Sequence, residues 1–286
     1  MKYLLLFLLF ICTSVSIAQS YPYTHLVTNI TDQLIYTNEP SVAVNNNNLI
    51  VGTNYNNWTT INRVGVFYSS DYGLNWVNGI MPKGFSGNST DDSDPSVSYD
   101  GLGNAYYVYL SKYSNSTGIF INKSTNGGAS WLSNSIEVIS ENEAHPSNID
   151  KPYIYIYKSG ILSENKIFIA YNYRNSDYVQ IRLMVGDIST LQFSGPFIVA
   201  SLSNTMGNYL QGPVPFFHST SSSLFIAYTE KLNNQFNIKI SKSIDSGINF
   251  GTPVNVASNI AHIGWYNTSP KKYCMGEGNG YYDTYF

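Results

Sequence analysis

Six charged side chains stand near the ends of short apolar runs, and they are the residues of this sequence best suited to chemistry. A carboxylate there can exchange a proton or accept hydrogen bonds from sugar hydroxyls, and Lys or Arg can bind acidic or hydroxylated groups. We therefore predict a ligand-binding rim formed by Glu39, Asp92, Asp94, Lys151, Arg174 and Glu230.

The acidic stretch at residues 91–94 carries the densest charge of the chain. It is a cation site, a grip on a sugar hydroxyl, or a solvated turn whose aspartates satisfy backbone groups at a strand entry. Calcium needs several more oxygen ligands than such a stretch supplies. The four histidines and two cysteines show none of the paired spacings of zinc sites, so we expect no metal and no cofactor.

These side chains need a scaffold, and the sequence contains a repeating one. A proline followed by a short strand-like run recurs at steps of 55, 57, 61 and 57 residues, at Pro40, Pro95, Pro152, Pro213 and Pro270. A period of this length indicates a fold built from one repeated structural unit.

A second marker, S-x-D-x-G-x-x-W, follows three of the prolines, once with Asn for Asp and once with Phe for Trp. Its members are Ser69, Asp71, Gly73 and Trp76; Ser124, Asn126, Gly128 and Trp131; and Ser243, Asp245, Gly247 and Phe250. A decayed copy ends at Phe193. The Asp or Asn accepts backbone N–H bonds in a tight turn, the glycine allows a positive φ, and the aromatic ring returns to an apolar layer. Each of these roles is structural, so the box predicts a fold and gives no indication of a catalytic or binding activity.

Each unit contains four short strands, and the second of them are predicted at residues 49–53, 105–110, 167–173 and 224–229. Four antiparallel strands in a repeat of this length are typical of a β-propeller blade. We therefore predict an all-β propeller of four-stranded antiparallel blades. The blades are expected at residues 38–90, 91–147, 148–207 and 208–262, with a partial blade at 263–286.

The partial blade repeats the second one, because Gly278-Asn279-Gly280-Tyr281-Tyr282 parallels Gly103-Asn104-Ala105-Tyr106-Tyr107. The sequence thus holds about four and a half blades of this type. Since an open propeller exposes strand edges, we expect the chain to be a C-terminally truncated form of a six-bladed protein.

The boxes, the period and the proline strands together resemble the Asp-box (BNR) repeat proteins, the sialidase-like propellers, over nearly all of the chain after its first residues. The resemblance implies an arginine cluster that grips a carboxylate, a tyrosine nucleophile activated by a glutamate, and an aspartate acid/base. Here Asn38 stands in the place of the first arginine, and residues 61–63, before the first box, hold no carboxylate. Arg63, Arg174 and Arg182, the three arginines, lack the family's Arg-x-Pro context. We predict a propeller without a working sialidase site.

The first eighteen residues have the pattern of an export signal. Lys2 gives a basic start, residues 3–12 form an apolar run, and Ser16 and Ala18 are small residues at the expected cleavage site. The alternative is a membrane anchor, for which the run is too short. We expect cleavage after Ala18 and a mature chain, residues 19–286, that is secreted or at the cell surface and is not inserted in a membrane.

A net charge of −3 excludes a basic nucleic-acid surface, so the expected partner is a glycan or a cell-surface protein. In a propeller, loops leaving the second strands share one face with loops entering the first strands, and the boxes lie opposite. The rim there also includes Asn38, Tyr55, Asn56 and Lys112. Three functions stay open. We favour non-catalytic binding over a divergent or truncated sialidase-type glycoside hydrolase and over a structural module of a larger secreted protein.

Overall fold

The computed structural model describes residues 36–56, 62–142, 148–157, 166–205, 207–233, 235–260, 265–267 and 272–274. Its strands form four four-stranded sheets and one two-stranded sheet. The first sheet contains β1 (Tyr36–Asn45), β2 (Asn48–Asn56), β3 (Arg63–Ser69) and β4 (Val77–Ile80), and the second contains β5 (Asp91–Tyr99), β6 (Ala105–Tyr113), β7 (Ser116–Ser124) and β8 (Ile136–Asn142). The third contains β9 (Ile149–Tyr157), β10 (Lys166–Arg174), β11 (Tyr178–Asp187) and β12 (Phe193–Ser203), and the fourth contains β13 (Tyr209–His218), β14 (Ser223–Leu232), β15 (Gln235–Ser243) and β16 (Val254–Ala257).

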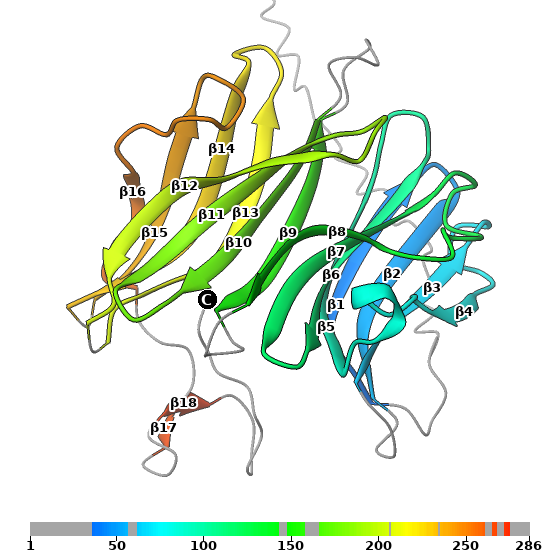
Figure 1. Cartoon of the computed structure of the whole chain (residues 1–286). Helices are drawn as coiled ribbons and strands as arrows, with labels where there is room; N and C mark the ends of the chain where they lie inside the picture. The colour runs from blue at the N-terminus through cyan, green and yellow to red at the C-terminus, as the bar shows by residue number, and fades with distance from the viewer. Residues whose placement is uncertain are drawn as a thin grey trace, which may run out of the picture.

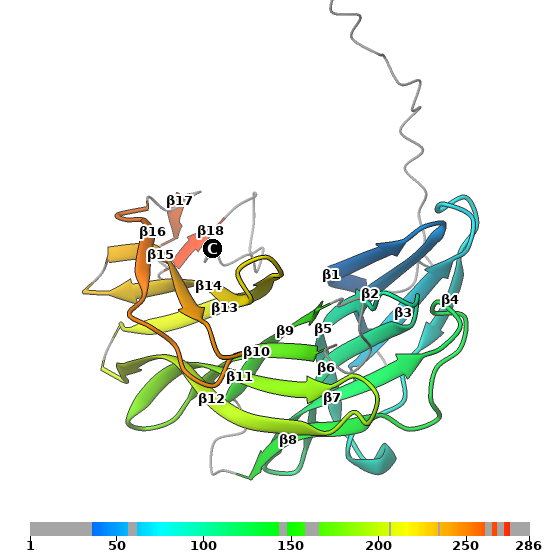
Figure 2. The ribbon, with the colours of Figure 1, turned by 90° about the horizontal axis from the view of Figure 1, so that it is seen from above.

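The sheets are the blades of a propeller (Figure 1). Within each sheet, strands that are neighbours in sequence pair antiparallel, and a short 3-10 turn, η1 (Phe85–Gly87), lies between the first two sheets. Seen from above, the sheets follow one another around an arc, with β1, β5, β9 and β13 on its inner side (Figure 2). The predicted all-β fold with four-stranded antiparallel blades is confirmed; a total of six blades stays a prediction.

Neighbouring blades meet through apolar layers because strand side chains alternate between the two faces of a sheet. On β6, Ala105, Tyr107 and Tyr109 join the layer against the first sheet, and the residues between them join the layer against the third. A similar layer lies between the third and fourth sheets. We call the face of a blade turned toward the following blade its outgoing face, and the opposite one its incoming face. Strands buried on both faces read as continuous apolar runs.

The residue before each repeat proline has a left-handed backbone. The φ angles are 51° at Glu39, 54° at Asp94, 47° at Lys151 and 63° at Gly212. In each inner strand the pairing register shifts at this point, which is the mark of a β-bulge. A bulge re-aims the side chain that it carries. The side chains of Glu39, Asp94 and Lys151 are therefore each oriented by a β-bulge at the same position of the repeat.

The three boxes form turns of the kind predicted. In the first, Ser69 Oγ accepts the Gly73 N–H at 2.9 Å, and Asp71 Oδ1 accepts the Asn75 N–H at 2.9 Å. The equivalent bonds recur in the second box, with Asn126 as the acceptor, and in the third, with Asp245. The three box glycines have φ angles of 86°, 110° and 95°. Tyr72 N–H donates to the Asn47 carbonyl, so the first box lies at the end of its blade where β1 turns into β2.

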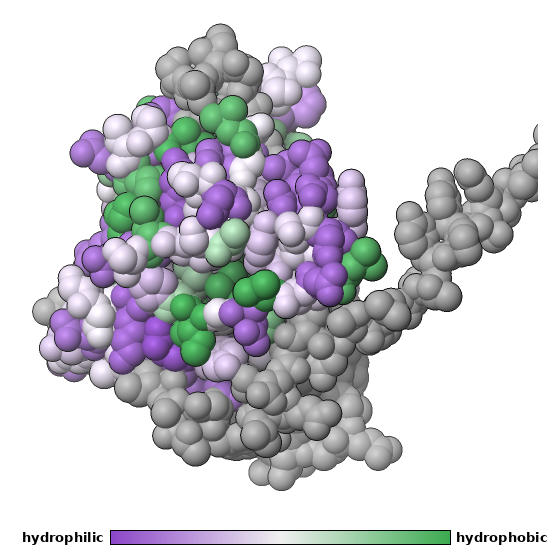
Figure 3. Space-filling model, turned by 90° about the vertical axis from the view of Figure 1, so that its right-hand side faces the viewer, coloured by the Kyte–Doolittle hydropathy of each residue, from purple (hydrophilic) through white to green (hydrophobic). Residues whose placement is uncertain are grey.

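Two predicted regions are described little or not at all. The export signal, residues 1–18, lies outside the described residues. Of residues 263–286 the structure describes β17 (Trp265–Asn267) and β18 (Lys272–Cys274), which pair antiparallel with each other. Among the described residues, no helix has the length and hydrophobicity to cross a membrane. On the side of the molecule where β3 and β4 lie, hydrophobic and hydrophilic side chains are interspersed (Figure 3).

Candidate functional site

Three of the six predicted rim residues meet near the inner strands of the arc. Lys151 Nζ lies 2.5 Å from Glu39 Oε2 and 3.4 Å from Asp94 Oδ1. Each residue comes from a different blade and occupies the same repeat position, directly before the proline of an inner strand. We call Glu39, Asp94 and Lys151 the axial cluster.

Backbone and amide contacts between blades hold the axial cluster in place. Asn54, near the end of β2, donates from Nδ2 to Glu39 Oε2 at 3.2 Å and accepts the Asp94 N–H at Oδ1 at 2.8 Å. Asp94 Oδ2 in turn accepts the Lys151 N–H at 3.4 Å. A left-handed conformation costs a residue with a side chain roughly 1–2 kcal/mol. Such strain is concentrated at functional sites, so its recurrence here marks the cluster as a candidate site.

The two carboxyl groups are less acidic than usual. Burial raises the pKa of Glu39, and so do the hydrogen bond and the charge of Asp94, while Lys151 opposes the rise. Burial also raises the pKa of Asp94, against the effects of Glu39 and Lys151. Burial alone would lower the pKa of Lys151, but the charges of Asp94 and Glu39 hold it above its ordinary value. The cluster therefore has an ammonium whose pKa is raised beside two carboxyls whose pKa values are also raised.

A cavity of about 280 Å³ adjoins Lys151 between the third and fourth blades. Its other lining residues are Tyr153, Tyr209, Gln211, Gly212, Val214 and Thr229. Gly212 is the fourth blade's residue before the repeat proline, and its lack of a side chain leaves space there. Aromatic rings with a few polar groups are the common lining of small-molecule sites, and they suit a sugar, which has apolar faces and a hydroxylated edge.

Asp92 lies in a different setting, because its side chain is completely buried. Its carboxylate accepts hydrogen bonds from Ser111 Oγ at 2.7 Å and from Arg63 Nε at 3.2 Å. Burial raises the pKa of Asp92, and the hydrogen bond from Ser111 and the charge of Arg63 oppose the rise. Arg63 also donates to the Met81 carbonyl. This network ties the first blade to the second and has no exposed carboxylate to offer a ligand.

Arg174 and Glu230 also bind other partners within the described chain. Arg174 donates to Asn204 Oδ1 and to the Asn208 carbonyl, each at 3.2 Å, and so fixes the connection from β12 to β13. Glu230 is buried and pairs with Lys239 at 3.0 Å. The structure therefore brings three of the six predicted rim residues together in the axial cluster. The other three, Asp92, Arg174 and Glu230, each bind a different partner elsewhere in the fold.

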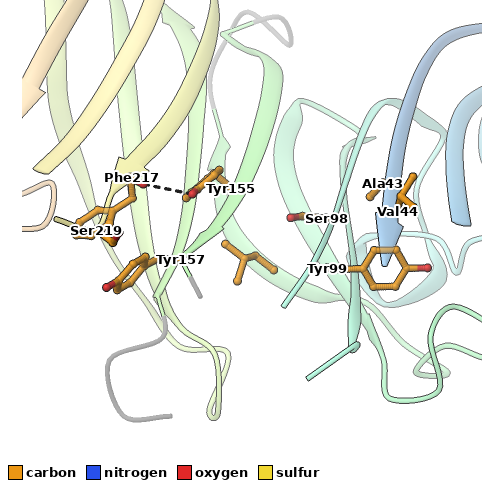
Figure 4. A pocket seen from close by; sticks show the side chains of 9 residues that line it. Ala43, Val44, Ser98, Tyr99, Tyr155, Tyr157, Phe217 and Ser219 are labelled. Atoms are coloured by element: carbon orange, nitrogen blue, oxygen red, sulfur yellow. Dashed lines mark hydrogen bonds between the residues drawn. The ribbon is translucent and has the colours of Figure 1, made fainter. Parts of the chain in front are cut away.

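A second cavity lies toward the opposite end of the inner strands and has a volume of about 420 Å³. Tyr155, Tyr157, Phe217 and Ser219 line one side, and Ala43, Val44, Ser98 and Tyr99 line the other (Figure 4). The Tyr155 hydroxyl donates to the Phe217 carbonyl at 3.3 Å. Since no charged side chain lines this cavity, it offers surfaces for packing and no acid/base chemistry.

No cluster of three or more His, Cys, Asp or Glu side chains suited to a metal ion occurs within the described residues. In the axial cluster, Lys151 places one positive charge beside two carboxyls. The sequence signal for this arrangement is a charged residue before the proline in three successive repeats, as Glu39-Pro40, Asp94-Pro95 and Lys151-Pro152. A shared repeat position becomes a spatial cluster only once the blades are arranged around one axis.

No family model and no curated protein matches the sequence. Solved structures do match. The α-L-arabinanase of Penicillium chrysogenum in complex with arabinobiose has a TM-score of 0.57 at 15% identity, covering 77% of this chain and 66% of that one. A mutant of the α-L-arabinofuranosidase Arb93A of Fusarium graminearum, with an iminosugar inhibitor, gives 0.55 at 14% identity, with 80% and 68% covered.

NanB plus optactamide gives a TM-score of 0.53 at 11% identity, covering 78% of this chain and 52% of that one. The chain thus spans about two thirds of the length of the two arabinose-related enzymes and about half of NanB. At these identities the likeness concerns architecture. This chain has the β-propeller fold that occurs in glycoside hydrolases.

Proposed function

We propose that this chain is an exported Asp-box propeller that binds a glycan at the axial cluster. The observation that carries the proposal is the convergence of Glu39, Asp94 and Lys151 from three blades beside a cavity with two tyrosines. Lys151 and Asp94 can donate to and accept from adjacent hydroxyls of one sugar, while the ring of Tyr153 or Tyr209 offers an apolar face. The three box turns with one hydrogen-bond pattern and the N-terminal leader sequence support the Asp-box and export parts of the proposal.

A glycoside hydrolase of divergent type is the second candidate. The raised pKa of Glu39 favours it, because a carboxyl that keeps its proton can act as a general acid. Two-carboxylate hydrolysis, however, uses groups about 5–5.5 Å apart in retaining enzymes and roughly 6.5–9.5 Å apart in inverting ones. Lys151 Nζ contacts both Glu39 and Asp94, so one ammonium engages both carboxyls. This geometry favours binding.

The test is a glycan array followed by calorimetric titration with the tightest ligand. Replacing Lys151 by Met or Asp94 by Asn is expected to weaken binding about tenfold or more, because a charge-assisted hydrogen bond contributes roughly 1.5–3 kcal/mol. Arg174→Gln is the matched control and leaves the affinity unchanged. The proposal fails if no glycan binds, or if the cluster variants bind as tightly as the parent. Release of sugar from a bound glycan that is abolished by Glu39→Gln would establish the hydrolase instead.

A further inference from the structure

Asn172 in the third blade occupies the same repeat position as Asn54 in the first. Each of the two amides pairs, across its own sheet, with the residue two places before the repeat proline of that blade. Side chains alternate along a strand, so Asn172 shares a face of β10 with Phe168 and Ala170, which pack in the layer against the fourth sheet. Asn172 therefore lies on the outgoing face of the third blade.

The oxygens of these two amides differ in their partners. Asn54 Oδ1 accepts the N–H of Asp94, the residue before the repeat proline of the following blade. Asn172 is only 8% exposed, and its Oδ1 accepts no hydrogen bond from the described part of the chain. Most buried polar groups in folded proteins are paired, because an unpaired one costs free energy. The oxygen of Asn172 is therefore suited to a donor from outside the chain.

Space for a ligand adjoins Asn172. The fourth blade has Gly212 at the position that Asp94 holds in the second, and a side-chain carbon added there would meet no atom within 4 Å. Gly212 and Lys151 line the cavity of about 280 Å³ described above. Asn172 pairs with Asp150, which directly precedes Lys151. The amide thus lies beside the wall of a cavity that can admit part of a ligand.

A second buried amide on the same face narrows the chemistry. Asn148 is 6% exposed, and its Nδ2 donates no hydrogen bond within the described residues. Its carbonyl accepts the N–H of Arg174, two residues after Asn172 on β10, so the two amides are diagonal neighbours. One hydroxyl can accept from Asn148 and donate to Asn172, whereas a carboxylate has no proton to donate and an ammonium cannot accept.

We propose that Asn148 and Asn172 form a subsite that binds one uncharged hydroxyl of the glycan. The subsite rests on the proposed function, which brings the glycan to Lys151, and it adds two residues that determine specificity. Sugars with a hydroxyl at this point satisfy both amides. Sugars with a charged group there, or with none, leave at least one amide without a partner.

Asn172→Leu tests the subsite in the exported form of the chain. The probes are a glycan array grouped into neutral, uronic-acid and amino-sugar oligosaccharides, and then the tightest neutral one in calorimetric titration. The variant removes an acceptor without a partner in the free protein, so its Tm is expected to equal or exceed that of the parent while its affinity falls about fivefold or more. Asn54→Leu is the matched control, and its Tm is expected to fall because Asn54 has two partners in the chain. A lower Tm with unchanged affinity for Asn172→Leu would show a structural role and overturn the subsite.

Monodeoxy derivatives of the same oligosaccharide identify the hydroxyl. Removal of one hydroxyl is expected to weaken binding to the parent about fivefold and to leave binding to Asn172→Leu unchanged. If every derivative loses the same factor with both proteins while Lys151→Met still weakens binding, the subsite is wrong and the proposed function stands. Tighter binding of the uronic-acid group than of the neutral group, unaffected by Asn172→Leu, has the same meaning. If no oligosaccharide binds, the proposed function fails and the subsite fails with it.

Discussion

At the scale of single residues, the axial cluster depends on Lys151. One ammonium contacts two carboxyls whose burial favours their protonated forms, and its positive charge opposes that effect. Raised pKa values mean that the folded state binds more protons than the unfolded state. The stability associated with Glu39 and Asp94 is therefore fully present below their ordinary pKa values and is lost as the pH rises through the folded values.

Lys151→Met is expected to increase this loss. Without the ammonium the pKa of each carboxyl rises further in the folded state, so the variant is destabilised more at pH 7 than at pH 4. Thermal unfolding of parent and variant at both pH values checks the prediction. Lys151→Arg retains the charge and is expected to show a much smaller difference between the two pH values. An equal drop in Tm for Lys151→Met at pH 4 and pH 7 would show that the lysine acts through packing.

At the scale of elements, the box turn has a carboxylate acceptor in two blades and an amide acceptor in another. Hydrogen bonds from Asn75 lower the pKa of Asp71 to about 2, and those from Asn249 and Ser243 do the same for Asp245. The second turn uses neutral Asn126, whose Oδ1 accepts the Ser130 N–H and whose Nδ2 donates to Ser130 Oγ. A carboxylate with a lowered pKa contributes stability that is present above its ordinary value and is lost as the pH falls through about 2.

Replacing Asp71 by Asn together with Asn75 by Ser rebuilds the Asn126–Ser130 pair in the first blade. This double variant is expected to keep the parent Tm at pH 7 and to lose less stability between pH 5 and pH 2. Thermal unfolding across that range is the measurement. The reverse exchange, Asn126→Asp with Ser130→Asn, is the control and should increase acid sensitivity. If both exchanges leave the acid limb of the stability curve unchanged, the box carboxylates do not set it.

The sequence predicts features that depend on residues close together in the chain, and it misses those that depend on contacts between distant strands. The box turns involve residues two to four apart, so Ser69, Asp71 and Gly73 predict their own geometry. Asp92 and Glu230 were expected on an open rim, and the structure buries both. Arg63 comes from the preceding blade and Lys239 from the adjacent strand β15, so burial of these charges depends on blade packing and strand pairing. The left-handed residue before each proline also escapes a local pattern, since Glu and Lys rarely adopt this conformation.

At the scale of the whole molecule, the blades form a chain of nearest neighbours. Each apolar layer is shared by two sheets, so a defect in one layer weakens two blades at once. Ile169 lies fully buried in the layer between the second and third sheets. Its position makes it a probe of how strongly the two halves of the arc are coupled.

Ile169→Ala is expected to cost roughly 2–5 kcal/mol of the free energy of unfolding, the usual range for a buried isoleucine. Leu102→Ala, at a side chain exposed in a turn, is the control and should change it by no more than about 0.5 kcal/mol. Denaturant titration followed by tryptophan fluorescence measures both. Unfolding of Ile169→Ala in two separate steps would show that this layer couples the halves; a single transition with an unchanged midpoint would contradict the prediction.

Each of the four blades has one residue with a left-handed backbone directly before its repeat proline, and we call this position its seat. Three seats hold Glu39, Asp94 and Lys151, and the fourth holds Gly212, where an added side chain would meet open space. These positions lie outside the three apolar layers, although Glu39, Asp94 and Lys151 contact one another across blades. Asn and Asp tolerate a left-handed backbone, which makes Gly212 the natural place to add a fourth group. The side chains that we propose to bind a ligand are thus set at one position per blade, and each can be tested by its own substitution.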